Sequence, residues 1–211
     1  MDQTHPDSIN IKEKEDVVVV EELDLSWKSL TALPPLPSGL KRLYCQGNQL
    51  TALPSLPPGL KELYCHVNKL TALPPLPSGL EVLTCGDNQL TELPLLPSGL
   101  KKLYCGDNKL TTLPPLPSGL KKLTCGDNQL TELPLLPFTL ESMYCPGNGL
   151  TALPPLPRGL KWLNCMGNHL TALPLLPSGL ETLYCRGNPL KYKVLTIEEI
   201  RKEQEEGLNE L

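Results

Sequence analysis

This chain of 211 residues lacks the segments that would place it in or across a membrane. No apolar run approaches the roughly 18 residues of a spanning helix, so we expect no contact with a membrane. The first residues lack the basic and then apolar segments of a secretory signal peptide. We therefore expect a cytoplasmic protein, or one delivered into a host cell without a signal peptide.

Histidines and aromatic residues are also scarce, and basic residues are slightly outnumbered by acidic ones. The net charge of −4 argues against nucleic-acid binding by bulk electrostatics. Three histidines and no Cys-x-x-Cys motif make a zinc site unexpected. Only one residue is Phe, whereas 48 are Leu and 24 are Pro. A globular core ordinarily mixes Val, Ile, Phe and Leu, so this composition indicates a short pattern copied many times.

The copied pattern is 20 residues long. All eight cysteines are spaced by 20, from Cys45 to Cys185, and an asparagine follows three residues after each one. The unit reads L-x-x-L-x-C-x-x-N-x-L, which is the leucine-rich-repeat pattern with Cys in the third apolar position. We expect three parts: an N-terminal segment and edge cover at 1–20, with 1–12 loose; nine strand units at 21–190; and a C-terminal cap at 191–211.

Each unit has two physically different halves. Around Leu43 to Cys45 the apolar residues alternate, which predicts a strand with one buried face. The second half carries prolines that remove amide donors and favour extended backbone, so it cannot be an α-helix. We predict a mainly β, curved solenoid with a parallel concave sheet and an extended or polyproline-II convex side. A helix at about 196–206, begun by a Thr196–Glu199 capping box, should cover the last repeat together with Val194, Leu195, Ile197 and Ile200.

The unit, with L-P-x-L-P in its second half, resembles the short bacterial leucine-rich repeat of YopM-like and IpaH-like secreted effectors. The matching motifs cover residues 30–190. The resemblance implies a solenoid that recognises proteins, in some members as the substrate-binding arm of a ubiquitin ligase. This chain departs from that pattern at both ends: no helical hairpin is evident in 1–20, and 21 residues after Leu190 are too few for a ligase domain.

The cysteines are predicted to be buried and reduced. Cys85, Cys105 and Cys125 precede an Asp by two residues, as does the nucleophile of the ligases resembled here. An inward thiol lacks the exposure and the positive neighbour that a catalytic thiolate needs, so we expect no catalytic residue. Neighbouring cysteines should lie about 5 Å apart, within disulfide reach, but each has two equivalent neighbours. We expect no cofactor and no metal.

Two polar columns accompany the cysteines. The asparagines should be structural, because a buried amide can satisfy backbone groups of adjacent repeats. Asp87, Asp107 and Asp127 should stack at roughly 5 Å, where like charges repel. A bridging cation such as Ca²⁺ is one interpretation. The other is a solvated column whose charge is offset by Lys102 and Lys122.

The outward strand positions carry the strongest binding signal, because they alone vary between repeats. Large aromatic residues and arginine there are typical of interface anchors, although aromatic residues also suit any sheet surface. The candidate partner-binding residues are Arg42, Tyr44, Tyr64, His66, Lys102, Tyr104, Lys122, Tyr144, Trp162, Met166, Tyr184 and Arg186.

Three functions follow from these observations. The leading one is a non-enzymatic, monomeric protein-binding module that recognises an unidentified protein on its concave sheet. The second is the recognition arm of an effector ubiquitin ligase without its catalytic domain. The third is a consensus-like or designed repeat scaffold with no specific ligand.

Overall fold

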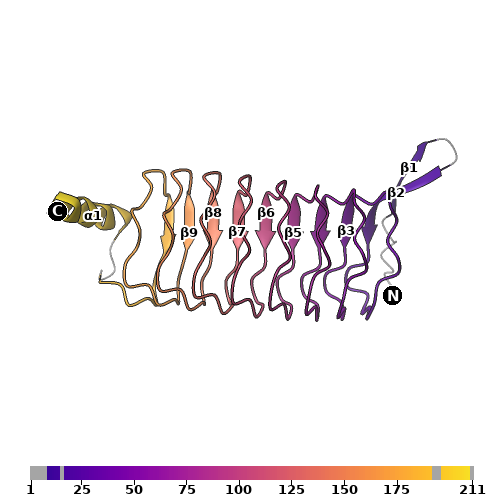
Figure 1. Ribbon diagram of the computed structural model, residues 1–211, viewed down its shortest axis with the longest axis horizontal. Helices are drawn as coiled ribbons and strands as arrows, with labels where there is room; N and C mark the ends of the chain where they lie inside the picture. Colours follow the sequence, from indigo (N-terminus) through magenta and orange to yellow (C-terminus); the bar gives the residue numbers. More distant parts are fainter. Residues whose placement is uncertain (1–8, 15–16, 192–195, 210–211) are drawn as a thin grey trace, which may run out of the picture.

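The computed structural model describes residues 9–14, 17–191 and 196–209, and they form one sheet and one helix (Figure 1). The ten strands lie side by side in chain order. Strands β2 to β10 are parallel, which confirms the nine predicted strand units, and β1 pairs antiparallel with β2. The elements are β1 (Ile9–Lys14), β2 (Val17–Asp24), β3 (Arg42–Tyr44), β4 (Glu62–Tyr64), β5 (Val82–Thr84), β6 (Lys102–Tyr104), β7 (Lys122–Thr124), β8 (Ser142–Tyr144), β9 (Trp162–Asn164), β10 (Thr182–Tyr184) and α1 (Ile197–Asn209).

Equivalent residues of successive repeats lie directly beside one another. Leu43 pairs with Leu63 and Tyr44 with Tyr64, and the same register holds at every parallel strand pair. A constant period of 20 residues makes this possible, because each turn of the solenoid advances the chain by one strand. Every position of the repeat therefore forms a column along the molecule.

The core consists of stacked leucine columns and the cysteine column. In the repeat of β6, Leu100, Leu103, Cys105 and Leu110 are completely buried. The cysteines from Cys45 to Cys165 are all fully buried, as predicted, and all eight thiols are free. One repeat has no second layer of its own, so burial of these side chains depends on the neighbouring repeats.

The asparagine column joins each repeat to the one before it. The Asn108 amide nitrogen donates to the carbonyls of Cys85 at 3.0 Å, Cys105 at 3.2 Å and Gly106 at 3.1 Å. Its side-chain oxygen accepts the backbone N–H of Leu90 at 2.9 Å. The predicted structural role of this column is confirmed, since the amide satisfies backbone groups that the bend would otherwise leave unpaired.

The residue before each asparagine has a left-handed backbone conformation, a feature that the sequence reasoning missed. The φ angle is +66° at Gly47 and +60° at Gly147, but also +54° at Val67 and +53° at Asp107. Glycine reaches this conformation without steric cost, and Asp tolerates it better than most residues. The sequence carried a signal for this conformation, because the residue before the asparagine is Gly or Asp in every repeat except that of Val67.

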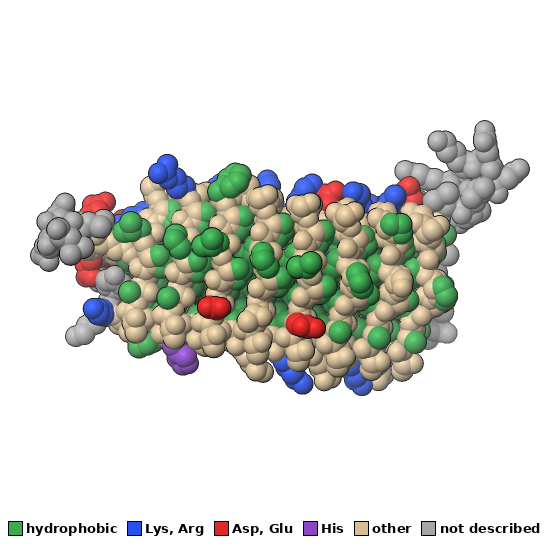
Figure 2. All heavy atoms as spheres, viewed as in Figure 1, with side chains coloured by type: hydrophobic (Ala, Val, Ile, Leu, Met, Phe, Trp, Pro, Cys, Tyr) green, Lys and Arg blue, Asp and Glu red, His purple; other side chains and the backbone are tan. Residues whose placement is uncertain are grey.

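Where the structure describes it, the second half of each repeat contains no helix or strand and carries the chain back to the start of the next strand. Its prolines supply carbonyls rather than amide donors, and the turn that follows closes with a hydrogen bond from Leu100 N–H to Pro97 O at 3.0 Å. We call the surface formed by these segments the return face. In Figure 2 hydrophobic side chains lie in rows across the stacked repeats, and Lys and Arg side chains gather along the two long edges of the view.

At the N-terminus, β1 and β2 form a β-hairpin that includes part of the segment 1–12, which we expected to be loose. Residues 9–12 belong to β1, which pairs with β2 through an irregularity between Asn10 and Ile11. The Val-rich segment at 17–20, predicted as an extra strand or edge cover, lies in β2. The hairpin projects beyond the row of short strands (Figure 1). Residues 1–8 lie outside the described part of the chain.

At the C-terminus, α1 covers the last repeats, and the predicted capping box is present. Thr196 N–H donates to the Glu199 carboxylate at 2.7 Å, and Glu199 N–H donates to Thr196 Oγ1 at 3.2 Å. Ile200 is buried, and Ile197 packs against the core. Val194 and Leu195, the other predicted cover residues, lie outside the described residues. Among the described helices, none is long and apolar enough to cross a membrane.

Candidate functional site

The candidate residues all belong to one surface, which we call the sheet face. It consists of the side chains of β3–β10 that point away from the core, together with the second residue after each strand. Arg42, Tyr44, Tyr64, Lys102, Tyr104, Lys122, Tyr144, Trp162 and Tyr184 lie on the strands, and His66, Met166 and Arg186 lie two residues after β4, β9 and β10. The structure divides this surface into three clusters along the solenoid.

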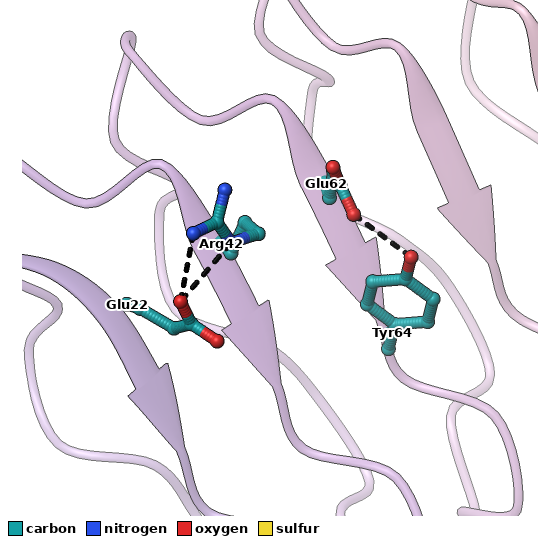
Figure 3. Close-up of polar contacts among 4 residues, drawn as sticks. All are labelled: Glu22, Arg42, Glu62 and Tyr64. Atoms are coloured by element: carbon teal, nitrogen blue, oxygen red, sulfur yellow. Dashed lines mark hydrogen bonds and ion pairs between the residues drawn. The ribbon is translucent and has the colours of Figure 1, made fainter. Parts of the chain in front are cut away.

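The first cluster, over β2 to β4, is held together by its own contacts (Figure 3). Arg42 donates to the Glu22 carboxylate from Nε at 3.2 Å and from a terminal nitrogen at 2.8 Å, and Tyr64 Oη donates to Glu62 at 2.8 Å. The Tyr44 and Tyr64 rings stack with centroids 4.9 Å apart. Burial and the bonded Glu62 carboxylate raise the pKa of Tyr64 to about 12. These polar groups already have partners, so this end of the sheet face is the least available for a ligand.

The second cluster, over β6 and β7, carries unpaired positive charge. Lys102 and Lys122 are opposite each other in the register of the two strands, and both are exposed. Among the described residues, neither forms an ion pair, whereas the preceding Lys101 contacts Glu81 at 2.6 Å and Lys121 contacts Glu141 at 3.4 Å. Two neighbouring ammonium groups repel each other, and an anionic group of a partner would relieve this repulsion.

Tyr104 is the aromatic residue of this second cluster. Its register neighbours are Thr84 on β5 and Thr124 on β7, so the residues beside it are small. Its ring is partly buried and has no aromatic contact among the described residues. The structure therefore does not join Tyr104 to the aromatic residues at either end of the sheet face.

The third cluster, over β8 to β10, is an aromatic group. Tyr144 and Trp162 stack with ring centroids 5.8 Å apart and planes 9° from parallel, and Tyr184 meets Trp162 edge-on at 6.0 Å. Tyr184 is 48% exposed. Rings held by one another lose little conformational freedom when a partner covers them, which is a property of interface anchors.

Two residues beside this aromatic cluster were not among the candidates. A Cβ atom at Gly126 would lie 2.8 Å from the ring of Tyr144, so the missing side chain lets that ring lie over the neighbouring repeat. Asn164, between the rings in the register, is buried and accepts the Met166 backbone N–H at 3.1 Å. The sequence carried a signal for the space at Gly126, because this residue is the glycine of the third Gly-Asp-Asn repeat.

The carboxyl ends of the strands carry the aspartate column. Burial raises the pKa of Asp107, and repulsion from Asp87 and Asp127 on either side raises it further. His66 lies near Asp87; burial lowers the pKa of its imidazole more than the carboxylate raises it. Within the described ranges, no group of three or more His, Cys, Asp or Glu side chains is arranged to hold a metal ion.

The cysteines behave as core residues and do not resemble nucleophiles. Burial raises the pKa of the Cys45 and Cys165 thiols to about 12, and burial raises those of Cys85, Cys105 and Cys125 as well. A catalytic cysteine needs the opposite shift and access to solvent. The Cys-x-Asp match to the ligases is therefore a coincidence of the repeat.

A solenoid of 20-residue turns, with one parallel sheet, a buried asparagine ladder and a variable sheet face, defines a leucine-rich-repeat protein. The family model for leucine-rich repeats in two copies matches residues 78–118. The leucine-rich-repeat domain of a Shigella effector is 32% identical, with a TM-score of 0.64, and the alignment covers 87% of this chain and 74% of that one. This chain belongs to the leucine-rich-repeat family and resembles the repeat arrays of bacterial effectors.

Two other solved structures are also similar to this chain. YopM from Yersinia enterocolitica WA-314 is 38% identical with a TM-score of 0.81, and the alignment covers 82% of this chain and 39% of YopM. The functional domain of InlJ from Listeria monocytogenes, described as including a cysteine ladder, is 27% identical with a TM-score of 0.63 over 87% of this chain and 47% of that one. The chain thus spans less than half the length of both. A comparison with curated proteins finds no match.

Proposed function

We propose that this protein is a non-enzymatic binding module that recognises a protein partner on its sheet face. The observation that carries the proposal is the stacked group of Tyr144, Trp162 and Tyr184. It begins on β8, directly beside β7 with the unpaired Lys122 and two strands from β6 with the unpaired Lys102. The rings supply apolar area at low entropic cost, and the lysines favour a partner that presents acidic groups nearby. The cluster around Arg42, whose polar groups are paired with one another, forms a preorganised surface at the edge of the contact.

The setting proposed for this binding is that of an effector inside a cell, in the cytoplasm of its own cell or of a host. The similarity to YopM and to the Shigella effector domain supports it. The matched residues comprise a repeat array alone, so the recognition arm of a ubiquitin ligase is the second candidate. A search for a ligase domain on the same full-length gene product, and a ubiquitin-transfer assay, separate the two.

The test uses Tyr144→Ala combined with Trp162→Ala. Proteins retained from a cell lysate by the wild type and lost by this variant are identified by mass spectrometry, and the affinity for each purified candidate is then measured. We expect binding to weaken at least about tenfold, because truncating central aromatic anchors typically removes ~2 kcal/mol or more. Circular dichroism and thermal unfolding should show an intact fold, because these side chains lie outside the core.

The matched control is Phe138→Ala, which removes an aromatic side chain that is 78% exposed in the return half of its repeat. This variant should retain every partner with unchanged affinity. If the double variant binds normally while Phe138→Ala abolishes binding, the partner binds on the side of Phe138 and the assignment to the sheet face is wrong.

A further inference from the structure

The return face carries an alternating column of exposed leucine and proline that the proposed function does not use. Leu95 is 83% exposed, Leu135 80% and Leu175 60%, although leucine is otherwise the buried residue of this chain. They occupy the same position in every second repeat, and exposed prolines occupy it in the repeats between them. The column reads Pro75, Leu95, Pro115, Leu135, Pro155 and Leu175.

Folding of a repeat does not require leucine at this position. The equivalent residue of an earlier repeat is Ser55, which is exposed and precedes the buried return turn in the same way. Three leucines that project into solvent in one row cost solubility without adding to the core, so they indicate a surface that is covered. Figure 2 shows the hydrophobic rows over the repeats, with very few acidic side chains among them.

We propose that the return face binds a second copy of this chain in antiparallel orientation. A two-fold axis in the plane of the face, along the return segments, reverses the order of the repeats. The six column positions alternate, so Leu95 of one copy then faces Pro155 of the other, and Leu135 faces Pro115. Every projecting leucine meets the shorter proline, and the two surfaces interlock without leucine opposing leucine.

The acidic side chains of this face select the same register. Glu92 and Glu132 are exposed three residues before Leu95 and Leu135. In the proposed register Glu92 faces Ala152 and Glu132 faces Thr112 of the other copy. A shift by one repeat sets Glu92 against Glu132, or Glu132 against itself, and also sets leucine against leucine. Like charges held face to face are destabilising, so these shifts are disfavoured.

The face is large enough for a stable contact. Six repeats at ~4.8 Å by eight residues at ~3 Å give a flat footprint of roughly 700 Å², and the accessible area over side chains exceeds the flat footprint. Stable interfaces bury about 800 Å² per partner, which is of this size. The dimer leaves both sheet faces free, so it would present two copies of the proposed binding surface. This proposal differs from the monomer that we expected from the sequence.

The first test is the oligomeric state of the full chain by sedimentation or light scattering across micromolar to submillimolar concentrations. The wild type should be a dimer, and the combined variant Leu95→Ser, Leu135→Ser and Leu175→Ser should raise the dimer Kd about a hundredfold or more, since three apolar side chains per copy are lost. Serine matches the residue already present at position 55. A monomeric wild type, or an undisturbed dimer in the variant, overturns the proposal.

The second test concerns the orientation and does not depend on disrupting the face. Ala72 and Ala172 are exposed, and the antiparallel register places one opposite the other across the dimer. In a Cys185→Ser background, a mixture of Ala72→Cys and Ala172→Cys proteins should be joined by a bismaleimide that spans ~10 Å, the distance between packed sheets. Ala72→Cys alone should not be joined, because the two copies of residue 72 lie five repeats apart. Cross-linking of Ala72→Cys alone, or none in the mixture, overturns it.

Discussion

At the scale of single residues, the left-handed position before each asparagine distinguishes the repeats most clearly. Gly47, Gly147, Gly167 and Gly187 occupy it with no Cβ, and Asp tolerates it in three repeats. Val67 is the exception, with φ at +54° and a β-branched side chain, a conformation that costs roughly 1–2 kcal/mol. The third repeat is therefore locally strained at its bend.

We expect Val67→Gly to stabilise the protein. Relief of the left-handed strain, offset by the greater entropy of glycine in the unfolded chain, should raise the free energy of unfolding by about 1 kcal/mol. Urea unfolding of the wild type and the variant measures the change. Gly147→Val makes the reverse substitution in another repeat and should destabilise. If Val67→Gly is less stable than the wild type, packing of the valine outweighs its backbone cost.

The cysteine column should make stability fall in alkaline solution. In the unfolded chain thiols ionise near pH ~8.5, whereas burial raises the pKa of Cys45 and Cys165 in the folded protein to about 12. A raised folded pKa means that the stabilisation is complete below the unfolded pKa and is lost as pH rises toward the folded pKa. Above pH ~9.5 each such thiol should lower the free energy of unfolding by up to ~1.4 kcal/mol per pH unit.

Urea unfolding at a series of pH values between 7.5 and 10 measures this loss. Cys105→Ala is the matched variant, because it removes one fully buried thiol. Its free energy of unfolding should be lower than that of the wild type at neutral pH, but should fall less steeply as pH rises, since one thiol fewer can ionise in the unfolded chain. Native thiol titration adds a second readout, in which Cys185, the one partly exposed cysteine, reacts first. Recovery of disulfide-linked cysteine pairs from the native protein, or stability independent of pH over this range, would contradict the free, buried column.

At the scale of elements, α1 is a cap for the end of the solenoid rather than an independent helix. The Gln204 side chain accepts the Leu176 N–H at 3.1 Å and donates to the Pro174 carbonyl at 3.1 Å. Arg201 donates to the carbonyls of Pro177 and Ser178. These groups belong to the last return segment, which has no further repeat to pair with, so the helix supplies the missing partners.

Deletion of residues 191–211 should therefore lower the melting temperature or cause aggregation. The point variant Ile200→Ala should lower the free energy of unfolding by about 2 kcal/mol, because Ile200 is almost fully buried. Hydrogen exchange should quicken in residues 173–190 and stay unchanged in the central repeats, since each repeat contacts only its neighbours. Lys202→Ala on the exposed side of α1 is the control. An unchanged melting temperature after deletion would argue against the capping role.

At the scale of the whole molecule, the sheet face and the return face are proposed to make two different contacts. The sheet face varies from repeat to repeat and holds the aromatic cluster and the free lysines, whereas the return face is nearly constant and carries the leucine–proline column. An antiparallel dimer through the return face would turn one modest binding surface into two, so a partner with repeated sites would gain avidity. The monomeric affinity for the sheet face and the dimer contact are separable, because their residues do not overlap.

The sequence by itself determined the solenoid. Because the period is 20 residues without insertions, each strand pairs with the next at equivalent positions. The positions of Leu43, Cys45 and Asn48 in one unit therefore predict the core positions of the repeats that follow. Asparagine at eight of the nine bends and proline in the return segments left no helical alternative within the array. The capping box at Thr196 was likewise readable from spacing alone. Residues outside the period were not readable: β1 forms where we expected no structure, because hairpin pairing depends on contacts that no repeat specifies.

Only the tertiary structure decided how the columns interact. The sequence placed Tyr144 and Trp162 in different outward columns, and their stacking depends on side-chain rotamers and on the space left by Gly126. The ring of Trp27 lies over Gly47 of the next repeat and is nevertheless 68% exposed. The same applies to charge: Arg42 pairs with Glu22 while Lys102 stays unpaired, a difference that follows from which side chains the register sets side by side. A repeat pattern specifies positions along the chain, whereas contacts between positions arise only when the turns stack.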